Sequence, residues 1–543
     1  MKDFKDKVIY QIYPKSFKDT SGNGVGDLRG IIKKLDYLEK LGVDYLWITP
    51  FFKSPQNDNG YDIADYYEID PDYGTMADLE ELIQKAKIRN IYLMLDMVFN
   101  HTSTDHEWFK KALAGDEYYK DFYFFRKNEG NLPTNWISKF GGPAWEYVES
   151  LDEYYLHLYD KTQADLNWEN PNVKKELFKI LNFWLEKGIK GFRFDVINVI
   201  SKDEFTDDFE GDGRRFYTDG KKVLEYLQEL NENSFGNYED VITVGEMSST
   251  SIENCIKYTK PENKALDMAF NFHHLKVDYK DGEKWSDMPV DFEAFKDLLE
   301  DWQVGMEKGN GWNALFLNCH DQPRSVSRFG DDEKYLKESA KMLATIIHMQ
   351  EGTPYIYQGE EIGMTNNYFE DINDYRDVET INYYHIMRKN GMREEEMKRI
   401  IQDKSRDNAR SPMQWAKSGG FTSGKAWIKE NPNKEEINVE DNLSDPDSIF
   451  YYYQKLIQVR KNYKVISRGT YERVLKDNSD LYAFKRKYNN EEALVINNLT
   501  GRELNINVKE IEEYEILISN IEINKLEENL NLKPYQALVL YKN

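Results

Sequence analysis

Three acidic residues stand at the ends of short apolar runs in this sequence, and they are Asp195, Glu246 and Asp321. Runs that are apolar almost throughout are typical of parallel strands covered on both faces. Barrel enzymes carry catalytic groups at the C-terminal ends of such strands, and a glycosidase that retains configuration needs a carboxylate nucleophile and a carboxylic acid about 5–5.5 Å apart. A single acid in this position is more often a loop cap or an ion-pair partner. Three acids, with Arg193 and His320 beside two of them, favour glycoside cleavage.

The two carboxyl groups of such a pair need different charges. Arg193 comes two residues before Asp195 and therefore lies on the same side of the strand. We expect its fixed positive charge to hold Asp195 ionised. Glu246 must instead stay protonated near neutrality, which requires partial burial or nearby carboxylates to raise its pKa.

The elements that must position these acids follow an alternating pattern. Helical patterns, for example at Asp27–Leu41, Met76–Arg89 and Pro171–Lys187, lie between short apolar runs. Eight strands with intervening helices predict the α/β class and a (β/α)8 TIM barrel rather than an open sheet. The eight predicted strands are Val8–Tyr13, Val43–Ile48, Ile91–Phe99, Gly191–Asp195, Val241–Glu246, Ala269–Phe272, Ala314–Asn318 and Pro354–Gln358.

Two regions depart from this alternation. Residues 102–170 lie between the third and fourth predicted strands, are rich in Trp, Tyr, Phe and Gly, and predict an inserted subdomain. After a predicted helix at Ser448–Lys461, residues 467–543 show short strands and predict a C-terminal antiparallel β-domain. The catalytic barrel then comprises residues 1–101 and 171–466. The predicted terminal strands are Leu481–Lys487, Glu492–Asn497, Tyr514–Ile518 and Ala537–Lys542.

Composition and charge exclude several classes of protein. The chain is 40% hydrophobic and 14% aromatic, which is too apolar for a disordered protein. Its 72 basic and 97 acidic residues give a net charge of −25, so we expect no nucleic-acid partner. The two cysteines, Cys255 and Cys319, are too few for a disulfide framework or a thiolate zinc site. The start lacks the apolar core of a signal peptide, and no apolar run approaches the ~18–20 residues of a membrane helix, so we expect a cytoplasmic protein without a membrane partner.

Four segments resemble the ordered signature segments of the α-amylase superfamily, glycoside hydrolase family 13. They are Asp96–His101, Gly191–Asp195, the strand that ends at Glu246, and His320-Asp321. The likeness extends over nearly the whole chain, including the insertion and the terminal β-domain. It implies that Asp195 is the nucleophile and Glu246 the general acid/base. It also implies that Asp321 binds a sugar hydroxyl and stabilises the transition state.

The resemblance assigns six further residues to the glucose unit that is cleaved: Tyr61, Asp62, His101, Arg193, His320 and Arg410. In the family a tyrosine stacks on this sugar, and an aspartate paired with an arginine closes the end of the pocket. Tyr61 resembles the tyrosine, and Asp62 with Arg410 resembles the pair. A closed end leaves room for one terminal glucose, so the resemblance implies exo cleavage. The alternative is that Arg410 only fastens the final loop of the barrel.

The segment Asp19–Asp27 resembles the family's calcium site in the first loop of the barrel. Its oxygen-bearing residues alternate, as a calcium loop requires. Only two of the implied ligands are carboxylates, so an occupied loop and an empty one are both compatible with the sequence, and we expect no cofactor to be required for the reaction. The implied ligands are Asp19, Ser21, Asn23, Val25 and Asp27.

Val196, directly after the predicted nucleophile, resembles the branch of the family that cleaves linkages other than α-1,4. Within that branch, residues 135–142, 245–250 and 271–279 are most similar to members that hydrolyse α,α-trehalose 6-phosphate. The resemblance implies a retaining exo-acting α-glucosidase that binds a phosphorylated disaccharide and releases glucose and glucose 6-phosphate. The alternative is an oligo-1,6-glucosidase that acts on isomaltose and isomalto-oligosaccharides.

Two other functions are disfavoured. A sucrose isomerase would carry an arginine-rich motif where this chain has Ile401–Arg406. Amino-acid-transporter heavy chains use the same barrel as a binding scaffold, but they carry a membrane helix and need not retain the three acids.

Recognition of phosphate requires positive groups close to the leaving sugar, because a chain with a net charge of −25 repels a dianion at long range. We expect side chains to supply the contacts, since the sequence has no glycine-rich phosphate loop. A single lysine or histidine is more often a solvated surface charge than a phosphate ligand. The candidates here cluster in the segments named above, which favours at least one contact with the phosphate. The candidates are Lys139 in the insertion and His273, His274, Lys276 and Lys284 after the strand that follows the general acid.

Overall fold

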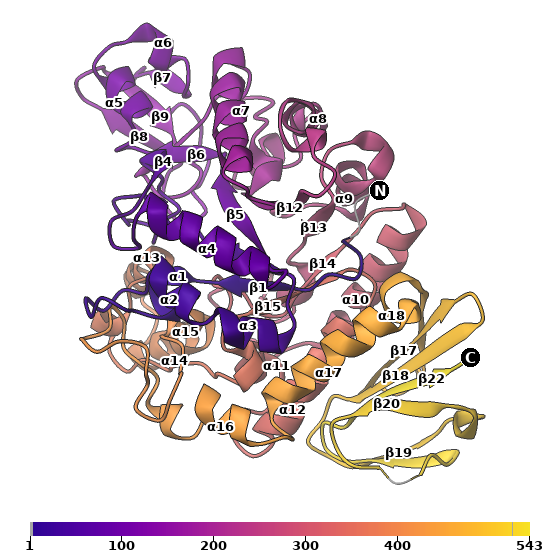
Figure 1. The fold of residues 1–543 in the computed structure, drawn as a ribbon. Helices are drawn as coiled ribbons and strands as arrows, with labels where there is room; N and C mark the ends of the chain where they lie inside the picture. Colours follow the sequence, from indigo (N-terminus) through magenta and orange to yellow (C-terminus); the bar gives the residue numbers. More distant parts are fainter. Residues whose placement is uncertain (1–3, 524) are drawn as a thin grey trace.

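The computed structural model describes residues 4–523 and 525–543. Eight parallel strands are ordered β13–β12–β11–β5–β2–β1–β15–β14, and a parallel bridge between Ala269 and Asn313 joins the two edges of this sheet into a barrel (Figure 1). Each strand overlaps one of the eight predicted runs, so the predicted TIM barrel is confirmed. The strands are β1 Ile9–Ile12, β2 Tyr45–Ile48, β5 Tyr92–Val98, β11 Gly191–Asp195, β12 Ile242–Glu246, β13 Met268–Phe270, β14 Ala314–Leu315 and β15 Thr353–Tyr357.

Helices cover the outside of the barrel (Figure 1). Side chains fix where they begin: Thr75 and Asp78 form a capping box at the start of α4, and Asn170 caps α7 directly before a proline. These caps position the helices against strands that are buried on both faces. The covering helices include α4 Met76–Ile88, α7 Pro171–Glu186, α8 Val223–Asn233, α10 Phe292–Lys308 and α12 Leu336–His348.

One continuous helix was predicted over residues 27–41, and this prediction was wrong. Two short helices, α2 (Leu28–Lys33) and α3 (Leu35–Leu41), occupy this stretch because Lys34 leaves the helical conformation between them. α2 packs on α4, whereas α3 packs on α17 (Ile449–Asn462). The two helices therefore pack against different helices. The spacing of apolar residues within residues 27–41 does not show this, because it contains no information about the packing partners.

Residues 102–170 contain regular elements that the sequence pattern did not show. β7, β9 and β8 form an antiparallel sheet, and β10 pairs with β6. A buried ion pair of 2.8 Å between Lys202 Nζ and Asp165 Oδ2 ties the end of this insertion to the loop after β11. The elements are β6 His101–Ser103, α5 Glu107–Leu113, α6 Glu117–Lys120, β7 Phe125–Lys127, β8 Trp145–Val148, β9 Glu153–Leu156 and β10 Gln163–Asp165.

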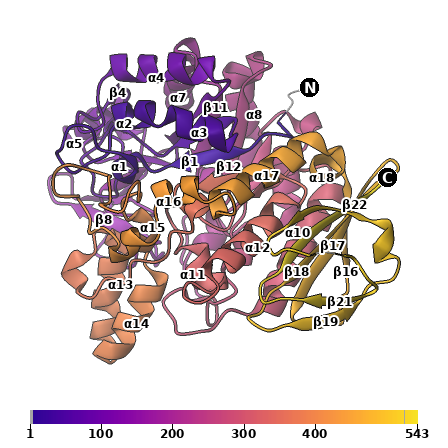
Figure 2. The same ribbon diagram turned by 60° about the horizontal axis from the view of Figure 1, so that its bottom comes forward.

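A further excursion follows β15, and the sequence pattern did not distinguish it from the barrel. It carries α13 (Val378–Lys389), α14 (Glu394–Lys404) and α15 (Asp407–Arg410), and Figure 2 shows α13 and α14 projecting from the body of the molecule beside α15. Asp377 caps α13, and Arg406 directly precedes α15. These two residues form an ion pair of 2.5 Å, which joins the two ends of the excursion.

The chain ends in an antiparallel β-domain, drawn in yellow in Figures 1 and 2. One sheet has the order β16–β17–β18–β22–β20, and β19 pairs with β21. The four predicted strands are present, but β16, β19 and β21 were missed because they are short and alternate between apolar and polar residues. Over the described residues, no helix combines the length and the apolar character needed to span a membrane. The strands are β16 Thr470–Val474, β17 Leu481–Tyr488, β18 Glu491–Asn498, β19 Leu504–Asn507, β20 Glu515–Ser519, β21 Asn529–Leu532 and β22 Ala537–Lys542.

Candidate active site

Two of the predicted catalytic acids end neighbouring strands. β11 and β12 pair in parallel with Phe194 opposite Gly245, so Asp195 and Glu246 stand side by side at the C-terminal end of the barrel. Arg193 contacts both: its Nη1 donates to Asp195 Oδ1 at 2.7 Å, and its Nη2 forms an ion pair with Glu246. One guanidinium group therefore holds the two carboxyl groups at the same mouth of the barrel.

The charge of Asp195 is set by opposing effects. Burial raises the pKa of this carboxyl group to about 7, while the Arg193 guanidinium lowers it. Asp96, which accepts from Arg193 Nη1 at 2.7 Å, adds a negative charge that raises the pKa again. Arg193 does pair with Asp195, as predicted, but burial outweighs its charge.

The third acid, Asp321, is surrounded by basic groups. Arg406 Nη1 and Arg410 Nη2 each lie 3.0 Å from its Oδ1, and His320 Nε2 lies 3.0 Å from its Oδ2. Burial alone would raise the pKa of Asp321, but these neighbours lower it well below its usual value. Asp321 therefore carries a fixed negative charge.

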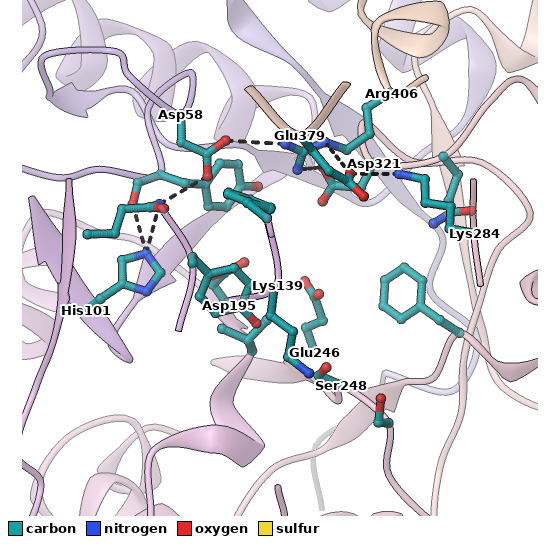
Figure 3. A pocket seen from close by; sticks show the side chains of 18 of the residues that line it. Asp58, His101, Lys139, Asp195, Glu246, Ser248, Lys284, Asp321, Glu379 and Arg406 are labelled. Carbon is teal, nitrogen blue, oxygen red and sulfur yellow. Dashed lines mark hydrogen bonds and ion pairs between the residues drawn. The ribbon is translucent and has the colours of Figure 1, made fainter. Parts of the chain in front are cut away.

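All three acids line one cavity of ≈ 220 Å³ at this end of the barrel (Figure 3). Arg193, His320 and Arg410 stand behind its wall, where they contact the acids rather than the open space. The predicted Tyr61 and His101 belong to the lining itself. The catalytic acids and the predicted sugar ligands are thus brought together around one space.

Tyr61 and His101 offer neutral contacts at one end of this cavity. Tyr61 stacks on His320 with ring centroids 5.2 Å apart and donates its hydroxyl hydrogen to Asp96 Oδ2 at 2.9 Å. His101 Nε2 lies 3.2 Å from both the carbonyl oxygen of Tyr61 and Gln163 Nε2. Burial lowers the pKa of His101 to about 4, so its ring is neutral. These groups can hold an uncharged sugar through ring contact and hydrogen bonds.

The predicted pair of Asp62 with Arg410 was wrong. Asp62 is fully buried, and its carboxylate accepts hydrogen bonds from the backbone amides of Asn57 at 2.8 Å and Asp58 at 3.1 Å. It therefore holds the turn that presents Asp58 and does not line the cavity. Asp58 is the lining residue, and its Oδ1 lies 3.5 Å from Arg406 Nη2.

Arg406 is the cation that closes this end of the cavity, and the sequence analysis did not select it. Its guanidinium carbon lies 5.0 Å from the ring centre of Phe140, which belongs to the insertion. Arg410, four residues later, contacts Asp321 and also donates Nε–H to the carbonyl of His320 at 3.0 Å. The spacing of four residues, which places two side chains on one helical face, was the signal available in the sequence.

Three of the lysines predicted to lie near the substrate, Lys139, Lys276 and Lys284, line the same cavity. Lys284 is neutralised by Glu379, with 2.7 Å between Nζ and Oε2. Lys139 and Lys276 have no carboxylate at ion-pair distance within the described part of the chain. Burial lowers the pKa of Lys139 to about 7, and burial with the nearby charge of Arg214 lowers the pKa of Lys276. Two lysine amino groups thus line the cavity with no carboxylate at ion-pair distance among the described residues, and that of Lys139 is charged below about pH 7.

The predicted phosphate ligands His273 and His274 lie elsewhere. His273 Nε2 lies 2.8 Å from the carbonyl oxygen of Thr250, and its ring stacks on Trp302. His274 Nε2 lies 2.8 Å from the carbonyl oxygen of Phe316. The 3-10 turn that carries both histidines directs their rings to backbone carbonyls of neighbouring segments. Burial lowers the pKa of both, so they are neutral and fasten this loop.

The predicted calcium loop is closed by its own hydrogen bonds. Asp19 Oδ1 accepts from the backbone amide of Ser21 at 2.8 Å, and its Oδ2 accepts from that of Gly24 at 2.9 Å. Asp27 caps α2 by accepting from the amide of Gly30 at 2.6 Å. The residues that the structure describes hold no cluster of three or more acidic, histidine or cysteine side chains suited to a metal ion.

Several lining residues escaped the sequence analysis. Most of them follow strand ends or come from the two excursions, and position after a strand end was the signal available for them. Ser248 and Ser249, for example, lie two and three residues after the end of the strand that carries Glu246. The lining residues that were missed include Asp58, Gln163, Ser248, Ser249, Glu379 and Arg406.

Comparison with known families identifies the class of protein. A model of the alpha-amylase catalytic domain matches residues 11–469, and a model of the alpha-amylase SusG C-terminal domain matches residues 481–539. The chain therefore belongs to the alpha-amylase family of glycoside hydrolases, as its signature segments predicted.

Individual relatives are similar over their whole length. The chain is 55% identical to the trehalose-6-phosphate hydrolase of Bacillus subtilis (strain 168), over 99% of this chain and 97% of that protein. It is 48% identical to the oligo-1,6-glucosidase of Bacillus cereus, over 99% of this chain and 98% of that protein. The crystal structure of Bacillus licheniformis trehalose-6-phosphate hydrolase matches with a TM-score of 0.95 and 56% identity, covering 100% of both chains.

Proposed function

We propose that the protein is a retaining, exo-acting α-glucosidase that hydrolyses α,α-trehalose 6-phosphate to glucose and glucose 6-phosphate. Asp195 attacks C1 of the glucose unit while Glu246 protonates the leaving oxygen, and a glucosyl ester forms on Asp195. Glu246 then takes a proton from water, which hydrolyses the ester with net retention. Asp321, ionised between its basic neighbours, stabilises the positive charge that develops on the sugar ring.

Exo cleavage follows from the closed end of the cavity. Asp58 and Arg406 stand together there, and Phe140 of the insertion lies against the same guanidinium. A sugar chain cannot continue through this wall, so the cavity admits one terminal glucose. The residues that form this wall come from segments outside the eight strands and their helices. The barrel strands alone therefore do not define which substrate fits.

The observation that carries the proposal is a pair of lysines in this cavity that have no carboxylate at ion-pair distance among the described residues. Lys139 and Lys276 line the same cavity as Glu246, and Figure 3 shows Lys139 beside Glu246 and Ser248. A phosphate group on the leaving sugar would supply the anion that both cations lack. Each charge-assisted hydrogen bond stabilises such a contact by about 1.5–3 kcal/mol.

The relatives support this substrate and define the alternative. The Bacillus subtilis and Bacillus licheniformis proteins are named for trehalose 6-phosphate, and their identity to this chain is higher than that of the Bacillus cereus oligo-1,6-glucosidase. An oligo-1,6-glucosidase would act on isomaltose, a neutral substrate. Neither Lys139 nor Lys276 would gain an anionic partner from isomaltose.

Hydrolysis of three substrates by the wild-type protein tests the proposal. We expect kcat/KM for trehalose 6-phosphate to exceed that for unphosphorylated trehalose and for isomaltose by about 10-fold to 150-fold for each lysine contact. α-Glucose should be the first product in a proton NMR time course. A higher kcat/KM for isomaltose would establish the oligo-1,6-glucosidase alternative instead.

We also propose that the protein acts in the cytoplasm and needs no metal or cofactor. The two free cysteines, Cys255 and Cys319, are both buried, and neither lines the cavity. The proposed reaction uses carboxyl groups and water alone. Treatment with EDTA should leave kcat for trehalose 6-phosphate within about twofold of the untreated value. Loss of activity that added calcium restores would contradict this expectation.

A further inference from the structure

We propose that Gln11 is a positioning residue for the reaction: its side-chain amide donates to Nδ1 of His320 and fixes the tautomer whose other nitrogen, Nε2, donates to Asp321. Gln11 lies in β1 and does not line the cavity, so it acts on the sugar only through these two residues. The inference rests on the proposed function, because Asp321 is assigned its role there, but it does not depend on the phosphate of the substrate.

The ring of His320 is enclosed by aromatic rings and by one polar group at each nitrogen. Tyr61 and Tyr13 stack on it, with ring centroids 5.2 Å and 5.9 Å away. Gln11 Nε2 lies 2.7 Å from Nδ1, and Asp321 Oδ2 lies 3.0 Å from Nε2. Gln11 and His320 are each 1% exposed, so solvent has little access to either contact. The two polar neighbours therefore decide where the ring carries its proton.

The charge of Asp321 selects the nitrogen that is protonated. Its basic neighbours hold the pKa of Asp321 well below the usual value, so the carboxylate only accepts hydrogen bonds. A bare Nε2 would repel this carboxylate, and Nε2 must therefore carry hydrogen. Burial lowers the pKa of His320, so the ring is neutral and holds one proton. Nδ1 is then an acceptor, and Gln11 must present its NH2 group to it.

The surroundings keep the ring in this neutral form. The charges of Arg410 and Arg193 act in the same direction as burial and oppose a second proton, while Asp321 alone acts against them. Gln11 lies opposite Trp47 of β2 and Tyr357 of β15, so neither neighbouring strand brings a charge to it. The charged and titratable groups around the pair are Asp321, Arg193, Arg410, Tyr13, Tyr61 and Tyr357.

The tautomer affects the reaction through Asp321, which stabilises the positive charge on the sugar ring in the proposed mechanism. If Nδ1 carried the proton, a nitrogen lone pair would face Asp321 Oδ2 at 3.0 Å, and the repulsion would displace the carboxylate. Without the donor of Gln11, this second tautomer becomes accessible. We therefore expect loss of the amide to lower kcat rather than to raise KM, because Gln11 does not touch the sugar.

The first test measures kcat and KM for p-nitrophenyl α-glucoside in Gln11→Met, which removes the donor and keeps an unbranched side chain. We expect kcat to fall by about 10-fold to 100-fold, the loss typical of residues that orient a functional histidine, with KM almost unchanged. Gln350→Met removes another fully buried glutamine, just before β15, and should leave kcat unchanged. In a His320→Ala background, Gln11→Met should cost nothing further. The same loss in that background would overturn the inference.

Gln11→Glu adds a readout that a purely structural role would not produce. The introduced carboxylate accepts from Nδ1–H and selects the wrong tautomer, whereas one added proton, on the carboxyl group or on the ring, restores Nε2–H. The kcat of this variant, divided by that of the wild type at the same pH, should therefore rise as the pH falls from about 8 to about 5. The corresponding ratio for Gln11→Met should stay constant. A ratio for Gln11→Glu that does not change with pH would contradict the assigned contact.

The tautomer itself can be observed by 15N NMR of the full-length protein labelled at its eight histidines. The signals of His320 are those missing from the spectrum of His320→Ala. We expect a protonated Nε2 and an unprotonated Nδ1 at pH 7, and a shift of the Nδ1 signal in Gln11→Met. A proton on Nδ1 in the wild type would overturn the inference. This measurement needs no substrate, so it still decides the tautomer if p-nitrophenyl α-glucoside is not cleaved and the proposed function fails.

Discussion

The two ends of the cavity differ in how their charges are neutralised. At the glucose end, Asp58 and Asp321 lie against Arg406, and further ion pairs join these groups to the excursion after β15. At the leaving-group end, Lys139 and Lys276 have no carboxylate partner in the part of the chain that the structure describes. A network whose charges are already paired is fixed in position before a neutral sugar arrives, whereas two unpaired cations gain stabilisation only when an anion arrives. We propose that the paired end holds the glucose unit and that the unpaired lysines select the leaving sugar by its phosphate.

The largest expected effects come from the catalytic acids, which serve every substrate. Asp195→Asn removes the nucleophile and should lower kcat by about 10³-fold or more for trehalose 6-phosphate and for p-nitrophenyl α-glucoside alike. Glu246→Gln should cost about 10²-fold to 10⁴-fold for trehalose 6-phosphate. The loss should be smaller for the p-nitrophenyl substrate, because its leaving group needs little protonation. Steady-state kinetics with both substrates measure these effects, and a small loss for Asp195→Asn would remove it from the mechanism.

Substitution of Asp58 probes the glucose end. Asp58→Asn removes a carboxylate beside Arg406 and the charged contact to the sugar, so kcat/KM should fall by about 10-fold to 150-fold. Because the glucose unit is common to both substrates, the loss should be equal for trehalose 6-phosphate and p-nitrophenyl α-glucoside. A loss confined to the phosphorylated substrate would contradict the division of the cavity. Measurement of Tm distinguishes loss of binding from loss of folding.

The pH dependence of selectivity should be a smaller effect. Since the pKa of Lys139 is lowered to about 7, its amino group is charged below that pH and loses its charge above it. The phosphate group is a dianion above about pH 6, so of the two groups in this contact only the lysine changes charge between pH 7 and 9. The ratio of kcat/KM for trehalose 6-phosphate to kcat/KM for p-nitrophenyl α-glucoside should therefore fall, by about tenfold at most. Taking the ratio cancels the ionisation of Asp195, and a ratio that rises with pH would exclude Lys139 as the phosphate ligand.

The barrel and its catalytic acids could be predicted from the sequence because both depend on local pattern. Nearly continuous apolar runs define the strands, and Asp195 and Glu246 are the last residues of two of them. Arg193 could be placed beside Asp195 because residues two apart in a strand share a face. The strands, the acids at their ends and the spacing of Arg193 and Asp195 can each be recognised within one short segment. Their prediction therefore did not require the position of any other part of the chain.

The boundaries of the substrate site could not be predicted, because they depend on turns and on contacts between distant segments. Asp58 and Asp62 are four residues apart, and only the fold of the turn decides that Asp62 is a buried acceptor and that Asp58 lines the cavity. The rings of His273 and His274 are directed by a 3-10 turn to carbonyls of other segments. Arg406 reaches the site through an excursion that no periodicity revealed.

Phosphate selection by the unpaired lysines is the central claim, and the double variant Lys139→Ala/Lys276→Ala tests it most directly. The quantity to measure is the ratio of kcat/KM for trehalose 6-phosphate to kcat/KM for p-nitrophenyl α-glucoside, in wild type, in the double variant and in Lys161→Ala as the surface control. With two charge-assisted contacts of about 1.5–3 kcal/mol each, the ratio should fall by about 10²-fold to 10⁴-fold in the double variant and stay unchanged in the control. An equal loss for both substrates, or none for either, would contradict the claim that these lysines recognise the phosphate.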